Sequence, residues 1–342
     1  MLQFLPSWFR GILSTFLVVL NTMVCGSLVT LLVPVKMIIP LEGWRNFWTG
    51  VMLRIGSLFI WINKNIQLLI HQIRWEISGL ENLDLNCKYL VISNHQSAVD
   101  IPVLQGIFHK VIPFPRFFIK QQLLWVPFLG VALWALGMPM MKRYSRKKLK
   151  QRPELRGKDL DRTRKACEHL REQPLTLLNF VEGTRYDPTR QDHQNSSFQY
   201  LLRPKSGGIH AVLQALGDQI EAILDVTIIY PDIQSPSFSD FTFGRLQRIR
   251  VEVDQLRLGE EGIPSLEEIR SREGGSHIRK WLNERWQRKE KMIGEYLEEH
   301  GEYELPKVIE PQVPGNADDE ALFQEKIETA PGVTRQRFGS DP

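Results

Sequence analysis

The sequence YLVISNHQSAVD (residues 89–100) places a histidine and an aspartate directly after a short apolar run. The run at residues 89–92 is partly β-branched and is stopped by polar residues, which is typical of a buried strand that ends in a loop. His95 and Asp100 lie in that loop. A carboxylate beside an imidazole fixes its tautomer and stabilises the imidazolium that forms when the histidine takes a proton. The stretch therefore predicts a strand of a sheet and half of a general-base site.

The spacing of these two residues also arises by chance in many chains. The alternative interpretation is an ordinary loop histidine that caps the next helix, with an aspartate suited to the helix N-terminus. Of the eight histidines, only His95 is followed by an aspartate five residues later. The spacing of five residues between a histidine and an aspartate therefore occurs only at His95 and Asp100.

Length and charge set the class of protein. A chain of 342 residues is long enough for one large domain with appendages. Its net charge is +4, but from Glu298 onward acidic residues outnumber basic ones by 11 to 4, which leaves +11 on residues 1–297. A basic body suits anionic partners. Because the chain shows no zinc-finger, helix-turn-helix or RNA-binding signature, we expect no nucleic-acid partner.

The three cysteines, Cys25, Cys87 and Cys167, are scattered along the chain. An odd number without close pairs argues against a disulfide framework and a structural zinc site. We expect them to be small core residues in a reducing compartment.

The N-terminal part of the chain is apolar. Residues 11–33 contain no charge and are long enough to cross a bilayer, for which about 20 apolar residues suffice. A cleaved signal peptide would have a shorter apolar core and a small-residue cleavage site, neither of which is clear. A second apolar stretch, residues 50–62, is interrupted by Arg54. We expect it to lie in the membrane interface rather than span.

The remainder of the chain alternates between strand and helix patterns. Strands are expected at residues 72–78, 88–93, 175–181, 222–230 and 248–253, the last as an edge strand; helices are expected at residues 100–109, 159–173, 205–216 and 278–297. Such alternation predicts an α/β fold with a sheet flanked by helices. We expect four parts: membrane-anchoring helices at 1–66, the α/β domain at 67–260, a helical extension at 261–303 and a disordered acidic tail at 304–342.

A third apolar stretch, residues 123–141, is cut by two prolines and two glycines. It predicts a broken segment on the membrane surface or along an acyl pocket rather than a straight membrane helix. Seven basic residues follow within residues 142–152. They suit either a solvated loop or contact with anionic lipid head groups.

A second polar cluster, Glu182-Gly183-Thr184-Arg185, follows the strand predicted at residues 175–181. Glycine permits close backbone approach, threonine offers a hydroxyl, and arginine presents a planar fork that matches phosphate oxygens. The tetrapeptide alone could be an ordinary turn. Beside a proton acceptor at the end of a neighbouring strand, it indicates a site for a phosphorylated substrate whose hydroxyl is deprotonated.

The chain resembles the lysophospholipid acyltransferases, typified by 1-acylglycerol-3-phosphate acyltransferase. The resemblance covers roughly residues 70–230 and rests on three motifs in the family's order: NHQSAVD at 94–100, FIK at 118–120 with VPFLG at 126–130, and FVEGTR at 180–185. It implies His95 as the base with Asp100 as its partner. It also implies phosphate contacts from Arg185 and Lys120, and a glycerol phosphate pocket shaped by Glu182, Gly183 and Thr184.

The family implies acyl transfer from an acyl thioester, acyl-CoA or acyl-carrier protein, to the hydroxyl of a lysophospholipid in the membrane, with 1-acylglycerol-3-phosphate as the leading acceptor. We expect no metal and no other cofactor. The chain has no G-x-S-x-G elbow, Walker loop or dinucleotide fingerprint. Together with the basic body, the cysteines favour a catalytic domain facing the cytosol, on the inner membrane if the protein is bacterial.

One strand departs from many family members. Residues 223–227 read ILDVT, where a proline between aliphatic residues is common in the family. This resembles the branch of lysocardiolipin and lysophosphatidylinositol acyltransferases and some bacterial relatives, so lysophosphatidylglycerol, lysophosphatidylinositol and lysocardiolipin stay open as acceptors. Two further readings also stay open: a lipid-binding protein without activity, and a hydrolase that uses the same base on water.

Overall fold

The computed structural model describes residues 2, 4–126, 129–141, 174–187, 198–260 and 262–301. The chain divides into two compact units, residues 1–304 and 305–342. The basic run at 142–152, the helix predicted at 159–173 and the acidic tail lie outside the described residues. The boundaries expected inside the first unit stay predictions.

A six-stranded sheet forms the centre of the first unit, in the order β1-β8-β7-β2-β6-β3. β3, β6, β2 and β7 are mutually parallel, β8 runs antiparallel to β7, and β1 pairs parallel with β8. Their bounds are β1 Arg74–Ser78, β2 Lys88–Ser93, β3 Pro115–Phe117, β6 Leu175–Phe180, β7 Ala222–Ile229 and β8 Arg248–Leu256. The expected α/β fold is confirmed. β8 is not an edge strand as predicted, because β1 pairs along its outer side, more than 150 residues away in sequence.

Strand β2 is central because its side chains are apolar on both faces. Leu90, Val91 and Ile92 are fully buried. Successive side chains of a strand point to opposite faces, so Tyr89 and Val91 pack in one core cluster while Leu90 and Ile92 face the other side. Near-continuous apolar runs of this kind are typical of parallel strands covered on both faces.

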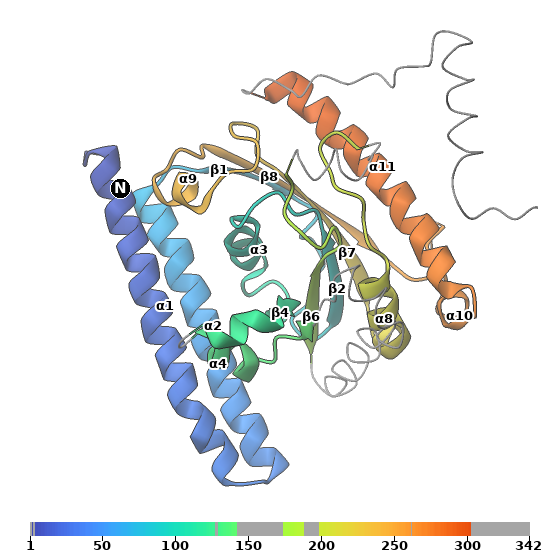
Figure 1. Cartoon of the computed structure of the whole chain (residues 1–342), viewed down its shortest axis with the longest axis horizontal. Helices are drawn as coiled ribbons and strands as arrows, with labels where there is room; N and C mark the ends of the chain where they lie inside the picture. Colours follow the sequence, from blue (N-terminus) through green and yellow to red (C-terminus); the bar gives the residue numbers. More distant parts are fainter. Residues whose placement is uncertain are drawn as a thin grey trace, which may run out of the picture. The chain divides into compact units, whose positions relative to one another are not determined.

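Helices cover the two faces of the sheet (Figure 1). On one face, α3 (Asp100–Phe108) inserts Val103, Leu104 and Phe108 into the cluster that contains β2 and β7 residues. On the other face lie α8 (Gly207–Leu216) and α11 (Gly274–His300), with the short α10 (Leu266–Arg270) between them in the chain. A short helix, α9 (Phe238–Thr242), follows β7.

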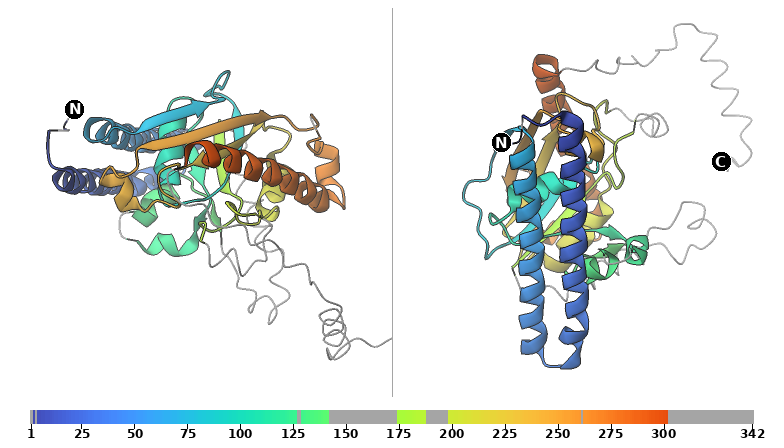
Figure 2. Two further views of the ribbon diagram at one scale, coloured as in Figure 1. Left: turned by 90° about the horizontal axis from the view of Figure 1, so that it is seen from above. Right: turned by 90° about the vertical axis from the view of Figure 1, so that its left-hand side faces the viewer.

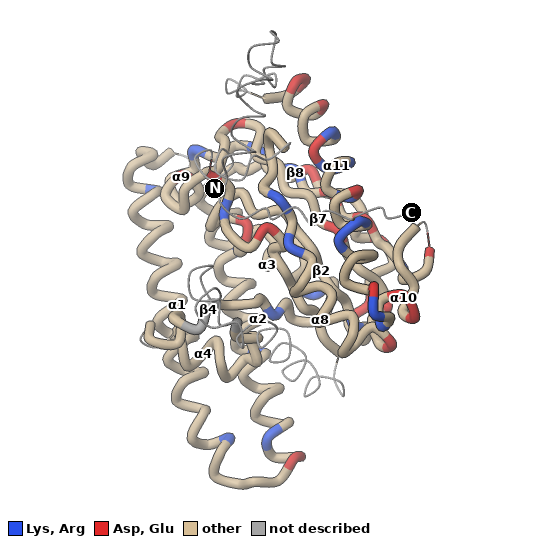
Figure 3. Tube along the Cα trace, turned by 45° about the vertical axis from the view of Figure 1, so that its right-hand side comes forward, with Lys and Arg blue, Asp and Glu red and all other residues tan. Residues whose placement is uncertain are grey.

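Two long N-terminal helices, α1 (Ser7–Ile38) and α2 (Glu42–Ile70), form an antiparallel hairpin (Figure 2). Asn21 of α1 donates to Asn63 of α2 at 2.8 Å, which joins the two helices through a polar pair. Within the described part of the chain, α1 alone is long and apolar enough to cross a membrane. Figure 3 shows that α1 and α2 carry few charges, in contrast to α10 and α11. The interfacial position expected for residues 50–62 stays a prediction; they lie inside the 29-residue helix α2.

The third apolar stretch is broken, as predicted. It folds into a 3-10 turn η1 (Gln121–Trp125), helix α4 (Leu129–Ala135) and strand β5 (Met140–Met141), which pairs with β4 (Ile119–Lys120). Trp125 is 87% exposed beside this segment. Helix α4 packs against α1, so the broken segment adjoins the candidate membrane helix.

Substitution of Leu90 by alanine tests the central place of β2. Because Leu90 is fully buried between neighbouring strands and helices, Leu90→Ala is expected to lower the free energy of unfolding by about 2 to 5 kcal/mol. Chemical denaturation in detergent measures this. Leu85→Ala is the control, since Leu85 is 49% exposed; equal losses in the two variants would contradict the assignment.

Candidate active site

The loop after β2 brings the imidazole of His95 to the carboxylate of Asp100. His95 Nδ1 lies 2.7 Å from Asp100 Oδ2. The side chain of Asp100 is fully buried, while that of His95 is 15% exposed. With Nδ1 engaged by the carboxylate, Nε2 is the ring nitrogen that remains for a substrate proton. The geometry is that of a base oriented by a buried acid.

Two further donors hold the carboxylate of Asp100. The backbone N–H of Ser97 donates to Oδ2 at 2.9 Å, and the hydroxyl of Tyr230, just past β7, donates to Oδ1 at 2.7 Å. Burial raises the pKa of Tyr230 well above its ordinary value, and the negative charge of Asp100 raises it further. Tyr230 therefore stays a hydrogen-bond donor across the physiological pH range.

The backbone around His95 is fixed by Asn94. Its side-chain amide donates to the carbonyl of Ile228 and accepts from the N–H of the same residue, both at 2.9 Å. Asn94 is fully buried, so both bonds form away from water. They tie the loop after β2 to the end of β7 and so bring Tyr230 within reach of Asp100.

The turn after β6 borders His95 on its other side. The ring of Phe180, the last residue of β6, stacks on the imidazole with centroids 3.9 Å apart. Gly183 has φ +75°, a conformation that favours glycine, and its N–H donates to the carbonyl of Phe180 at 2.9 Å. This tight turn returns the chain so that the Tyr186 N–H donates to the His95 carbonyl at 2.7 Å.

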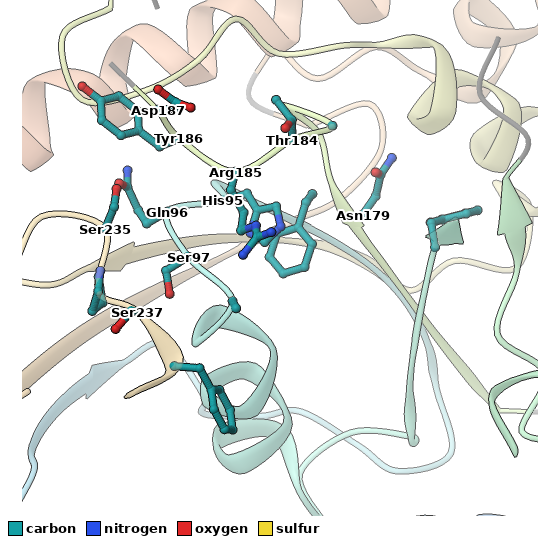
Figure 4. A pocket seen from close by; sticks show the side chains of 16 residues that line it. His95, Gln96, Ser97, Asn179, Thr184, Arg185, Tyr186, Asp187, Ser235 and Ser237 are labelled. Atoms are coloured by element: carbon teal, nitrogen blue, oxygen red, sulfur yellow. The ribbon is translucent and has the colours of Figure 1, made fainter. Parts of the chain in front are cut away.

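A cavity of about 550 Å³ opens over His95 (Figure 4). This volume suits a small-molecule substrate. The cavity is lined by residues of the β2 loop, the end of β6 and the turn after it, the segment up to the start of α9, and one residue between β3 and β4: His95, Gln96, Ser97, Ala98, Phe118, Asn179, Phe180, Gly183, Thr184, Arg185, Tyr186, Asp187, Ser235, Pro236, Ser237 and Phe238. Figure 4 shows His95 and Arg185 near the centre, with Ser235 and Ser237 on one side and Asn179 on the other.

The structure brings most of the residues predicted from sequence to this cavity. His95, Gly183, Thr184 and Arg185 line it, and Asp100 lies buried behind His95. Lys120 lies in β4, but its side chain is outside the described part of the structure. The roles assigned to these residues stay predictions.

Glu182 occupies a different position from the one expected. It is fully buried and does not line the cavity. Neither of its carboxylate oxygens has a partner within hydrogen-bonding geometry. Burial raises the pKa of Glu182 well above its ordinary value, and the Asp100 carboxylate raises it further. In this structure Glu182 therefore lies behind the site instead of on its surface.

Sequence reasoning missed three contributors: Tyr230, Asn94 and the wall at residues 235–238. Asn94 stands inside a motif quoted from the sequence, so its place directly before His95 was a usable signal. Tyr230 lies 130 residues after Asp100, and only the pairing of β7 with β2 brings them together. Among the described residues, no group of three or more His, Cys, Asp or Glu side chains is placed to hold a metal; the expectation of a metal-free reaction stays a prediction.

Comparison with known proteins shows what the central part of this chain is similar to. Residues 74–231 match the Acyltransferase family model. The resemblance to the lysophospholipid acyltransferases that the sequence predicted is therefore confirmed over this region.

Curated relatives are similar over the same region. The chain is 24% identical to mouse 1-acyl-sn-glycerol-3-phosphate acyltransferase epsilon over 230 residues, which cover 61% of this chain and 58% of that protein. It is 27% identical to human 1-acyl-sn-glycerol-3-phosphate acyltransferase alpha over 202 residues, which cover 58% of this chain and 61% of that protein. Zebrafish lysocardiolipin acyltransferase 1 is 24% identical over 136 residues, which cover 37% of this chain and 33% of that protein. The matched region thus spans about 60% of the first two relatives' length.

A solved structure shares the fold. The crystal structure of the 1-acyl-sn-glycerophosphate acyltransferase PlsC from Thermotoga maritima superposes with a TM-score of 0.52 at 17% identity, covering 84% of this chain and 96% of that one. The similarity extends beyond the family domain and supports the α/β architecture with its added helices.

Removal of the Tyr230 hydroxyl tests the support of Asp100. Because the bond ends on a buried carboxylate, Tyr230→Phe is expected to lower the free energy of unfolding by about 1.5 to 3 kcal/mol, measured by chemical denaturation. Tyr200→Phe is the matched control, since no hydrogen bond of its hydroxyl is found among the described residues. A loss no larger than that of the control would contradict the role of Tyr230.

Glu182→Gln tests the buried carboxyl behind the site. Since the pKa of Glu182 is raised in the folded state, ionisation opposes folding: stability falls as pH rises from the unfolded pKa, about 4.3, up to the raised native value. The variant avoids this loss, so the difference between its melting temperature and that of the wild type should grow as the pH rises over that range. Each kcal/mol of unfolding free energy that the variant retains should raise the melting temperature by about 2 to 4 °C. The exposed Glu81→Gln should show no such trend. Parallel pH profiles of Glu182→Gln and wild type would refute the shift.

Proposed function

We propose that this protein is an O-acyltransferase that moves a fatty acyl group from an acyl thioester to the free hydroxyl of a lysophospholipid, with 1-acylglycerol-3-phosphate converted to phosphatidic acid as the leading reaction. The observation that carries the proposal is the pair of His95 and Asp100, 2.7 Å apart, at the floor of a cavity that also holds Arg185. A base and a phosphate-binding fork in one cavity suit an acceptor with a hydroxyl near a phosphate.

In the proposed step, His95 Nε2 takes the proton of the acceptor hydroxyl as its oxygen attacks the thioester carbonyl carbon. A new C–O bond forms, the C–S bond breaks, and the proton passes from the imidazolium to the leaving thiolate. The buried charge of Asp100 stabilises the imidazolium meanwhile. A positioned base of this kind is worth about 10² to 10⁴ in rate.

Arg185 supports binding of the acceptor phosphate. It lines the cavity and is exposed, and a guanidinium matches two phosphate oxygens at once. We assign Lys120 a second phosphate contact. Holding the phosphate fixes the hydroxyl over His95, which supplies the positional part of catalysis.

The membrane supplies the acceptor and receives the product. Helix α1 is suited to membrane association by length and composition, and exposed apolar side chains such as Phe16 and Leu31 cover it. We place the protein at a membrane, the cell inner membrane if it is bacterial, with the catalytic domain facing the cytosol, where acyl-CoA and acyl-carrier protein are found.

A second acceptor class is favoured by one further observation. The wall formed by Ser235 and Ser237 adds hydroxyl groups to the cavity opposite Asn179. Hydroxyl groups suit a head group that carries its own hydroxyls, as in lysophosphatidylglycerol, lysophosphatidylinositol or lysocardiolipin. The similarity to a lysocardiolipin acyltransferase points in the same direction.

The test is acyl transfer by purified membranes that contain the protein. Labelled acyl-CoA or acyl-carrier protein is supplied with a panel of lysophospholipids, and His95→Ala is compared with His300→Ala, a control at the exposed end of α11. We expect a phosphorylated acceptor to be acylated, with a loss of at least about a hundredfold in His95→Ala and none in the control. No acylation of any lipid would favour a binding protein, and release of free fatty acid alone would favour a hydrolase.

A further inference from the structure

The segment at residues 198–202 is buried although it forms neither helix nor strand. Its buried side chains are those of Phe198, Tyr200, Leu201 and Leu202. Connecting segments usually run over the surface, because buried backbone N–H and C=O groups need hydrogen-bond partners. The partners of these backbone groups therefore show which elements the segment connects.

Helix α11 holds the segment through Glu290. The Glu290 carboxylate accepts from the backbone N–H of Gln199 and from that of Tyr200, the latter at 3.0 Å to Oε1 and 3.2 Å to Oε2. Hydrogen bonds to a charged acceptor are stronger than neutral ones. One turn further along α11, a side chain on Gly294 would come within 3.2 Å of the Tyr200 ring, so the ring lies close against the helix. Both contacts fix the segment on α11.

The carbonyl groups of the same two residues bind the wall of the cavity. The carbonyl of Gln199 accepts from the Tyr186 hydroxyl at 2.9 Å, and the carbonyl of Tyr200 accepts from Gln96 Nε2 at 2.8 Å. Tyr186 and Gln96 both line the cavity. Gln96 follows His95 in the chain, and the Tyr186 N–H donates to the His95 carbonyl at 2.7 Å. The segment is thus bonded to two residues that are joined directly to the base.

One peptide group connects α11 to Tyr186. The C=O of Gln199 and the N–H of Tyr200 belong to this group, which we call the linking peptide. It is trans, so its N–H and C=O point in opposite directions. The N–H ends on Glu290 and the C=O on the Tyr186 hydroxyl. A rotation of the linking peptide would therefore break both bonds together.

We propose that Glu290 is a positioning residue, which orients the linking peptide and so holds Tyr186 against the carbonyl of His95. Loss of the Glu290 carboxylate would free the linking peptide to rotate, and the base would lose a fixed support on one side. The proposal rests on the acyl-transfer function proposed above. It gives helix α11, which lies outside the residues 74–231 that match the family model, a part in the active site.

Glu290→Gln tests the proposal, because it places an amide NH₂ group where two backbone N–H groups need an acceptor. We expect kcat/KM to fall by about tenfold, since small displacements of a catalytic group are costly. The assay uses labelled acyl-CoA and the lysophospholipid that the wild type acylates fastest. Glu295→Gln is the matched control on the same helix, because the Glu295 side chain is 65% exposed, and it should keep the wild-type value. Equal losses in the two variants would overturn the proposal.

A double-mutant cycle with Tyr186→Phe separates positioning from a general effect on folding. Tyr186→Phe removes the hydroxyl that binds the linking peptide. In this background Glu290→Gln should lower kcat/KM by less than about threefold, because Glu290 acts through Tyr186. A larger factor would contradict the proposal, since a purely structural role of Glu290 does not depend on the Tyr186 hydroxyl.

A measurement without catalysis distinguishes this proposal from the proposed function. Fluorotyrosine incorporated in place of Tyr186 in the full chain gives a ¹⁹F resonance that reports the surroundings of its ring. The resonance should shift in Glu290→Gln and stay in place in Glu295→Gln; Glu290→Asp, which withdraws the carboxylate, serves if Glu290→Gln does not fold. An unchanged resonance would refute the positioning role even in an active enzyme. Absence of acyl transfer by the wild type would refute the proposed function alone, and the resonance would still test the contact.

Discussion

The buried carboxylate of Asp100 is the constraint on which the site depends. A charge removed from water is tolerated only where donors replace the lost hydration. Asp100 has three such donors: the His95 ring, the Ser97 N–H and the Tyr230 hydroxyl. Two come from its own loop and the third from the end of β7. The site is therefore complete only when β7 lies beside β2, as the sheet order places it.

Asp100 and Glu182 lie near each other but in opposite environments. Asp100 is surrounded by donors at hydrogen-bond distance, whereas the carboxylate oxygens of Glu182 have no hydrogen-bond partner. The two negative charges also oppose each other, which favours the neutral form of Glu182.

The wall of the cavity is connected to the candidate membrane helix. Residues 235–238 lead into α9, which packs on α1. At that contact a side chain on Gly11 would meet the ring of Phe243 at 2.3 Å, so glycine allows the two segments to approach. The candidate membrane helix thus adjoins the element that follows one wall of the cavity.

The sequence alone determined the elements and the local chemistry, because both depend on neighbours in the chain. Apolar runs predicted β2, β6 and β7, and the His95–Asp100 pair lies within one loop. The tertiary structure alone decided what depends on long-range packing. It placed β8 inside the sheet, because β1 pairs along its outer side, and it brought Tyr230 to Asp100 across 130 residues. It also left Glu182 buried outside the cavity lining, since the direction of a side chain after a strand depends on the elements that pack around it.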